Sequence, residues 1–112
     1  MNDNREKKLK KLLVTEVSMA LLDEVALPNG TFVTVMGAVL SPTLEHATII
    51  ISVFPLDKSD TTLEKLTHKI YPIQQVLNRR LNLRTVPKIR FELDTTEAKA
   101  AEIEKLIENI EK

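Results

Sequence analysis

Apolar side chains recur every three or four positions in two long parts of the chain, residues 3–25 and residues 63–81. This spacing predicts amphipathic helices, each with one apolar face turned toward a core. A Pro-Asn-Gly run at residues 28–30 is strong turn punctuation and ends the first helix. Thr61 and Glu64 have the spacing of a capping box, in which two side chains bond to free amides at a helix start. We therefore expect the second helix to begin there.

Pro72 interrupts the second helical pattern. A proline inside a helix removes one backbone hydrogen bond and clashes with the preceding turn. The sequence therefore predicts two helices that meet at a kink near Tyr71 and Pro72, in place of one straight helix.

Three shorter runs have the composition or the alternation of β-strands. Residues 32–40 and 46–54 are rich in valine and isoleucine, and Gly37 is a position where we expect a bulge. Because only residues 41–45 join these two strands, they should pair antiparallel. Residues 89–93 alternate apolar and polar side chains and predict a third strand.

A last helix is expected after the third strand. Asp94 or Thr95 would cap it, and its apolar stripe consists of Ile103, Leu106, Ile107 and Ile110. The order of elements is then helix, strand, strand, kinked helix pair, strand and helix, with a small three-stranded sheet covered by helices. This order predicts a single α+β domain over residues 1–112.

Charge is unevenly distributed along the chain, although its formal total is zero. Residues 65–91 contain seven lysines and arginines, one histidine and no carboxylate. Residues 1–91 hold 13 Lys and Arg against 9 Asp and Glu, a net charge of +4, whereas residues 92–112 hold 3 against 7, a net charge of −4. A region of one sign is typical of proteins that bind a polyanion, most often a nucleic acid. A solvated helix face with long basic side chains is the alternative interpretation.

The composition indicates binding rather than catalysis. The chain has no cysteine, which excludes disulfides and thiolate metal sites and fits a reducing cytoplasm. His46 and His68 lie in different predicted elements without a carboxylate pair at ligand spacing, and the two glycines form no phosphate-binding loop. We expect no metal, no cofactor and no enzymatic activity. No apolar run approaches the roughly 18 residues of a membrane helix, and the N-terminus is hydrophilic, so we expect neither a membrane span nor a signal peptide.

Two segments of the sequence resemble ribosome-binding factor A of bacteria. They are Ser41-Pro42-Thr43-Leu44-Glu45-His46-Ala47 and Leu83-Arg84-Thr85-Val86-Pro87-Lys88-Ile89-Arg90-Phe91. The resemblance extends over nearly the whole chain. It implies a type II KH-like fold and a role in late maturation of the small ribosomal subunit, including processing of the 5′ end of its rRNA. It also implies binding to the free small subunit, not to whole ribosomes, and a role in growth in the cold.

One part of the chain departs from the pattern of RNA-clamping KH domains. Those domains grip the nucleotide backbone with a Gly-x-x-Gly loop, which this chain lacks. The resembling family places an Ala-x-Gly kink between its two central helices, where this sequence has Lys69-Ile70-Tyr71 followed by Pro72. We expect the proline to preserve the kink, and Tyr71 to be a core or rim residue, with stacking on a base as the alternative.

The predicted RNA-binding surface consists of lysine and arginine side chains. The residues expected to contact phosphates are Arg79, Arg80, Arg84, Lys88 and Arg90. The lysines expected to extend this surface are Lys7, Lys8, Lys11 and Lys69. Arg90 belongs to this surface on the condition that no helix covers its face of the strand, which is opposite to the face of its apolar neighbours.

Two functions are considered, the first implied by the resemblance and the second suggested by the charge pattern. In the first, a cytoplasmic monomer binds the free small ribosomal subunit and its rRNA, without a catalytic step. In the second, the protein is an interaction adaptor whose acidic last helix docks a basic partner. The net charge of residues 92–112 is the reason for the second interpretation.

Overall fold

The computed structural model describes residues 2–96 and residue 107. Its elements are α1 (Asn2–Glu24), β1 (Phe32–Leu40), β2 (His46–Phe54), the 3-10 helix η1 (Leu56–Lys58), α2 (Ser59–His68), α3 (Ile70–Arg80) and β3 (Lys88–Leu93). This order confirms the predicted α+β class, and the predicted strands agree with the observed ones to within one residue. The predicted last helix lies almost wholly outside the described residues.

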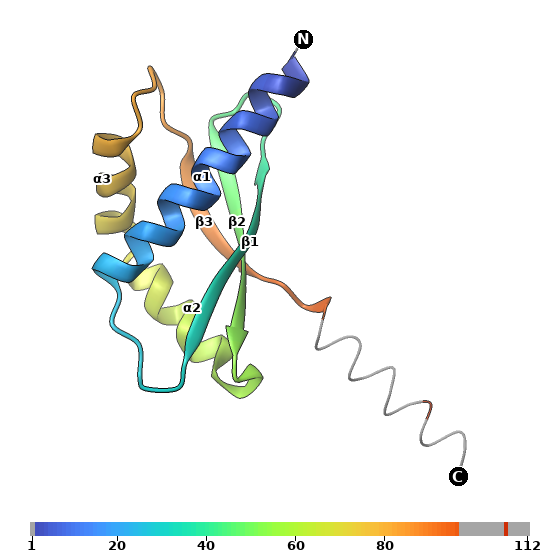
Figure 1. Ribbon diagram of the computed structural model, residues 1–112, viewed down its shortest axis with the longest axis vertical. Helices are drawn as coiled ribbons and strands as arrows, with labels where there is room; N and C mark the ends of the chain where they lie inside the picture. The colour runs from blue at the N-terminus through green and yellow to red at the C-terminus, as the bar shows by residue number, and fades with distance from the viewer. Residues whose placement is uncertain (1, 97–106, 108–112) are drawn as a thin grey trace.

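Helices cover one face of a sheet whose strand order is β1-β2-β3 (Figure 1). β1 and β2 pair antiparallel, as predicted, and β2 pairs parallel with β3. Alternate side chains of β2 are buried beneath the helices. They join one core with residues of all three helices, including Leu13, Val17, Leu66, Ile73 and Leu77. No described helix covers the other face of the sheet.

β1 carries a bulge at the predicted place. Pairing with β2 is regular up to Val35 and resumes at Gly37, so Met36 has no partner and is exposed. The extra residue shifts the alternation of the strand by one position. Odd-numbered residues face the core before the bulge, whereas Ala38 and Leu40 face it afterwards.

α2 and α3 meet at Lys69, which confirms the predicted helix pair and corrects the position of the kink. The sequence predicts the kink near Tyr71 and Pro72, but Lys69 (φ −97°, ψ 9°) both ends α2 and precedes α3. The Lys69 N–H donates to the carbonyls of Lys65 and Leu66, both at 3.1 Å. Pro72 is the third residue of α3, in the first turn, where an N–H has no partner within the helix. Tyr71 is 71% exposed and is therefore not a core residue.

The capping-box prediction is wrong. α2 begins at Ser59, so Thr61 and Glu64 lie inside the helix. η1 runs directly into α2, and Lys58 at the boundary makes no side-chain cap. The chain therefore enters α2 through a tight 3-10 turn, a common start for an α-helix.

Within the described part of the chain, no helix combines the length and the apolarity that crossing a membrane requires. The same residues include no group of three or more His, Asp or Glu side chains placed to hold a metal ion.

Candidate nucleic-acid interface

Three segments that are distant in sequence meet at one end of the molecule, at the top of Figure 1. They are the N-terminal half of α1, residues 41–45 between β1 and β2, and residues 81–87 between α3 and β3. A hollow of about 350 Å³ lies between them. We call this hollow the end pocket, and it is lined by Arg5, Lys8, Leu9, Leu12, Leu44, Leu83, Arg84 and Thr85.

Hydrogen bonds fix the β1–β2 turn at this end. The Ser41 N–H donates to the His46 carbonyl at 2.9 Å, and the His46 N–H donates to the Ser41 Oγ at 3.1 Å. The Leu44 N–H donates to the Ser41 carbonyl at 2.9 Å, while Leu44 itself has a φ of 61°, in the left-handed region. A 2.9 Å hydrogen bond from the Lys88 N–H to the Glu45 carbonyl ties the turn to β3. The turn that carries Leu44 to the end pocket is therefore held by its own backbone hydrogen bonds.

Three cations line the end pocket, namely Arg5, Lys8 and Arg84. All three are exposed, and within the described residues none of them forms an ion pair. Arg5 is not among the predicted site residues, which include only Lys7, Lys8 and Lys11 from this helix. The sequence does contain a signal for Arg5. It is three residues from Lys8, so the two side chains occupy neighbouring positions on α1. Three uncompensated positive charges around one hollow attract a polyanion.

Lys88 and Arg90 extend this positive surface along β3. Lys88 lines a neighbouring hollow of about 400 Å³ together with His46. The Arg90 side chain is 75% exposed, on the sheet face that no described helix covers, so the condition set for it is met in this part of the chain. Its Nε donates to the Thr48 Oγ1 at 3.0 Å, and its Nη2 lies 3.9 Å from a carboxylate oxygen of Glu92.

Arg80 is engaged by another part of the protein. Its Nε donates to the Glu16 Oε2 at 2.5 Å, which links α3 to α1. This hydrogen bond and the charge of Glu16 raise the pKa of Arg80, with a smaller contribution from Asp23. The positive charge of Arg80 is therefore largely compensated. Arg79 is exposed and forms no ion pair among the described residues, so it is the better candidate for a phosphate contact.

The remaining predicted cations lie apart from the end pocket. Lys69 is at the α2–α3 junction, where Glu24 at the end of α1 lines the same hollow. Lys7 and Lys11 are exposed but do not line the end pocket. Lys7 is one residue before Lys8 and therefore lies about 100° around the helix from it.

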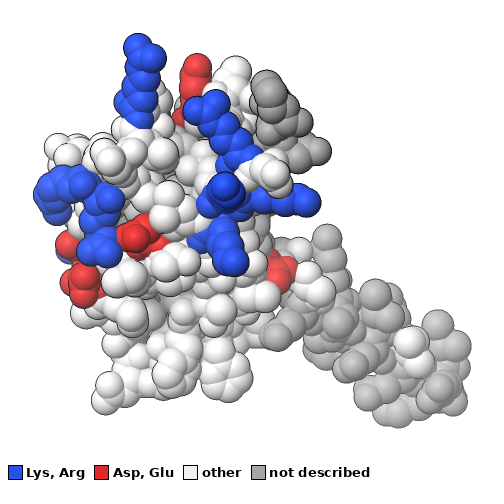
Figure 2. All heavy atoms as spheres, turned by 45° about the horizontal axis from the view of Figure 1, so that its top comes forward, with Lys and Arg blue, Asp and Glu red and all other residues white. Residues whose placement is uncertain are grey.

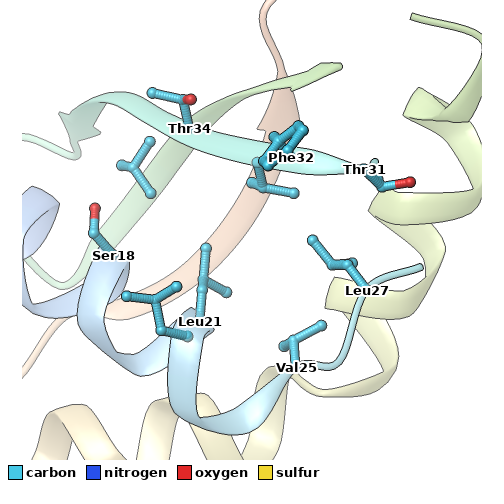
Figure 3. A pocket seen from close by; sticks show the side chains of 10 residues that line it. Ser18, Leu21, Val25, Leu27, Thr31, Phe32 and Thr34 are labelled. Atoms are coloured by element: carbon cyan, nitrogen blue, oxygen red, sulfur yellow. The ribbon is translucent and has the colours of Figure 1, made fainter. Parts of the chain in front are cut away.

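Figure 2 turns the end pocket's side of the molecule toward the viewer. Lys and Arg side chains gather over the upper part of this view, and the lower part is nearly free of charge. A separate hollow of about 460 Å³ lies between α1 and β1 (Figure 3). Leu21, Val25 and Leu27 line it opposite Phe32, and none of its lining residues is Lys or Arg. Its apolar lining does not suit phosphate. The exposed cations of the end pocket and β3 form the candidate interface.

Comparison with known sequences points to one family. A sequence model of the family described as "Ribosome-binding factor A" matches residues 5–107. The ribosome-binding factor A of Burkholderia ambifaria (strain MC40-6) is 32% identical over 104 residues, which cover 93% of this chain and 78% of that protein.

Solved structures share the fold. The crystal structure of ribosome-binding factor A from Thermus thermophilus aligns with a TM-score of 0.61 at 20% identity, covering 83% of this chain and 94% of that one. A homology model of the Thermus thermophilus factor, fitted into the cryo-EM map of a complex with the 30S subunit, aligns with a TM-score of 0.57 at 21% identity. That alignment covers 74% of this chain and 92% of the fitted one. At these identities the likeness concerns the fold.

Proposed function

The chain belongs to the ribosome-binding factor A family, and we propose that it binds the free small ribosomal subunit through its rRNA and assists late maturation of that subunit. The fitted 30S complex of the Thermus thermophilus factor supports the small subunit as the partner. The proposal includes processing of the rRNA 5′ end, a role in the cold and a cytoplasmic monomer that acts without catalysis. It also treats residues 1–112 as one domain.

The end pocket is the observation that carries the RNA-binding part of this proposal. Arg5 and Lys8 of α1 meet Arg84 of the α3–β3 loop, and no carboxylate pairs with them in the described part of the chain. Cations without internal partners are free to replace the counterions of an RNA backbone. Such contacts position the protein without reading sequence, so selectivity for the small subunit would come from the shape of its rRNA.

The α2–α3 junction supports a site away from the position of the Gly-x-x-Gly loop. In RNA-clamping KH domains that loop contacts the nucleotide backbone directly. Here the Lys69 N–H donates to two carbonyls of α2 and is not available to a phosphate. We therefore assign the main phosphate contacts to side chains at the other end of α3.

Binding alone is sufficient to assist assembly. A protein that binds one rRNA conformation more tightly than its competitors shifts the population toward that conformation. Misfolded RNA pairings last longer in the cold, so the contribution of such a factor should be largest at low temperature.

Co-sedimentation with free small subunits, free large subunits and whole ribosomes over a salt series tests the proposal. We expect selective, salt-sensitive binding to free small subunits. The variant Arg84→Gln/Lys88→Gln should lower the slope of log K against log salt by about 1.4 to 1.8, because two phosphate contacts are removed. The matched control Lys58→Gln/Lys65→Gln removes the same charge from η1 and α2 and should leave the slope unchanged.

Other outcomes point to other functions. Equal binding to all three particles would indicate general attraction to polyanions. Absence of binding even at low salt would contradict the proposal and favour the adaptor that uses the acidic residues 92–112. In cells, a deletion strain that grows equally well at low and high temperature, with normal rRNA 5′ ends, would remove the proposed roles in the cold and in processing.

A further inference from the structure

We propose that the end pocket receives one unpaired nucleotide of the RNA, with its base against the leucine side chains and its phosphates against the three cations. This inference rests on the proposed function and specifies how its RNA is bound. A general positive surface would bind RNA with and without bases equally well. A nucleotide subsite would bind RNA that has its bases more tightly.

The lining of the end pocket combines two kinds of chemistry. Leu9 and Leu12 from α1, Leu44 from the β1–β2 turn and Leu83 from the α3–β3 loop supply apolar surface from three separate segments. Leu12 and Leu83 are 38% and 40% exposed, so their apolar surface is available to a ligand. A flat base covers such surface, as bases do when they leave the stack and pack against protein side chains.

The cations line the same end pocket as the leucines. Arg5, Lys8 and Arg84 all line it, and no acidic residue does. A nucleotide carries a flat ring and a negative phosphate within one small unit, and this pairing matches the pocket.

The size of the end pocket fits a single nucleotide. Its volume of about 350 Å³ is near the lower end of small-ligand sites, which span roughly 300–1,000 Å³. Unpaired loops and bulges of RNA present single bases in this way, whereas the bases of a duplex are stacked inside it. The expected ligand is therefore an unpaired position of rRNA.

Leu44 supplies an independent observation. Its φ of 61° places a non-glycine residue in the left-handed region, a conformation with an energetic cost that tends to persist at functional sites. The same residue lines the end pocket and the two hollows beside it. A glycine would hold this backbone conformation without strain, yet the position carries a large apolar side chain that reaches the pocket.

Leu44 therefore offers a sharp test. Leu44→Gly removes one wall of the pocket while favouring the backbone conformation of the turn, so the variant should keep its fold. Leu83→Ser removes a second wall from a loop position, without changing charge. Circular dichroism and thermal melting of both full-length variants establish that they are folded.

The probes are two fluorescently labelled single-stranded RNAs of equal length and phosphate count, one with all bases and one abasic in its central positions. Fluorescence anisotropy at low salt gives the affinity for each. We expect the wild-type protein to bind the complete strand about five- to tenfold more tightly than the abasic one. Leu44→Gly and Leu83→Ser should bring this ratio close to one without weakening the abasic strand. Arg84→Gln should weaken both strands by the same factor.

Each alternative result is decisive. Equal binding of both strands by the wild-type protein overturns the nucleotide subsite, and if selective co-sedimentation with small subunits persists, the proposed function stands. A base preference that survives both leucine substitutions places base recognition elsewhere and also overturns the inference. Displacement of the RNA by an acidic, leucine-containing peptide at similar concentration would identify the hollow as a peptide site.

Discussion

The Gln74 carboxamide of α3 accepts a 2.9 Å hydrogen bond from the backbone N–H of Ile89 in β3. The same side chain donates to the Pro87 carbonyl at 3.0 Å. β3 is an edge strand, and these two bonds satisfy backbone groups that its pairing with β2 leaves open. They lie on either side of Lys88, so Gln74 holds the backbone that presents this cation.

Replacing Gln74 with leucine should therefore destabilise the protein. Gln74→Leu keeps the side-chain volume but leaves the Ile89 N–H and the Pro87 carbonyl without partners, at a cost of about 1–3 kcal/mol. Urea unfolding measures this change. Gln75→Leu is the matched control, because Gln75 makes no side-chain hydrogen bond within the described residues. Equal stability of the two variants would mean that water replaces both bonds.

Arg79 and Arg80 should respond differently to the same substitution. Arg79→Gln is expected to weaken binding to small subunits and to lower the salt slope by about 0.7 to 0.9. Arg80→Gln should change binding less, since Glu16 already compensates Arg80, and it should lower the melting temperature. Restoration of that melting temperature by adding Glu16→Gln would identify the unpaired carboxylate as the cause. A larger binding loss in Arg80→Gln than in Arg79→Gln would contradict this assignment.

Deletion of Met36 should be tolerated. Val35 pairs with Ile51 and Gly37 with Ile50, so removing the unpaired residue leaves a continuous ladder in which every core residue of β1 keeps its face. Thermal melting should show a fold of nearly wild-type stability. Deletion of Thr34 is the control, because it turns Val33 from the core to the open face and should cost more than about 1.5 kcal/mol. Similar melting temperatures for the two deletions would show that the register of β1 is not fixed.

Asp94 makes stability depend on pH in acid. The Asp94 Oδ1 accepts hydrogen bonds from the Thr96 side chain at 2.6 Å and the Thr96 N–H at 3.0 Å, and these bonds lower its pKa below the usual value of 3.8. The ionised carboxylate thus stabilises the folded state above pH 3.8, and this contribution is lost as the pH falls through the lowered pKa. Asp94→Asn should have a lower melting temperature than the wild type at neutral pH, and the difference should disappear in acid. A difference in melting temperature that does not change with pH would exclude this carboxylate as its source.

The strands could be predicted from the sequence because their signals are local. β2 alternates buried and open positions over its whole length between clear turn signals, and Gly37 marks the bulge. The boundary at Lys69 was missed because a proline is tolerated in the first turn of a helix as well as at a kink. The start of α2 was missed because η1, not a side-chain cap, begins it. The helix that Asp94 or Thr95 is expected to cap lies almost wholly outside the described residues.

The candidate site depended on contacts that no local pattern contains. Arg80 and Glu16 are 64 positions apart, so their pairing follows from the packing of α3 against α1. Arg5 joins Arg84 only because the start of α1 lies beside the α3–β3 loop. All nine predicted cations are exposed, but the fold places only Lys8 and Arg84 of them at the end pocket.

The pairing of β2 with β3 has a consequence for the order of folding. Each of its residue pairs is 42 positions apart, as His46 and Lys88 are, whereas Val39 and Thr48 in the hairpin are 9 apart. Closing the longer loop has the larger entropic cost, so the hairpin should form early and β3 should dock late. Lys88 and Arg90 are part of β3 and reach their final positions when it docks. The hydrogen bond from the Lys88 N–H to the Glu45 carbonyl forms at the same time. If RNA binds at the proposed interface, a newly made chain would gain its full affinity for RNA only at this final step.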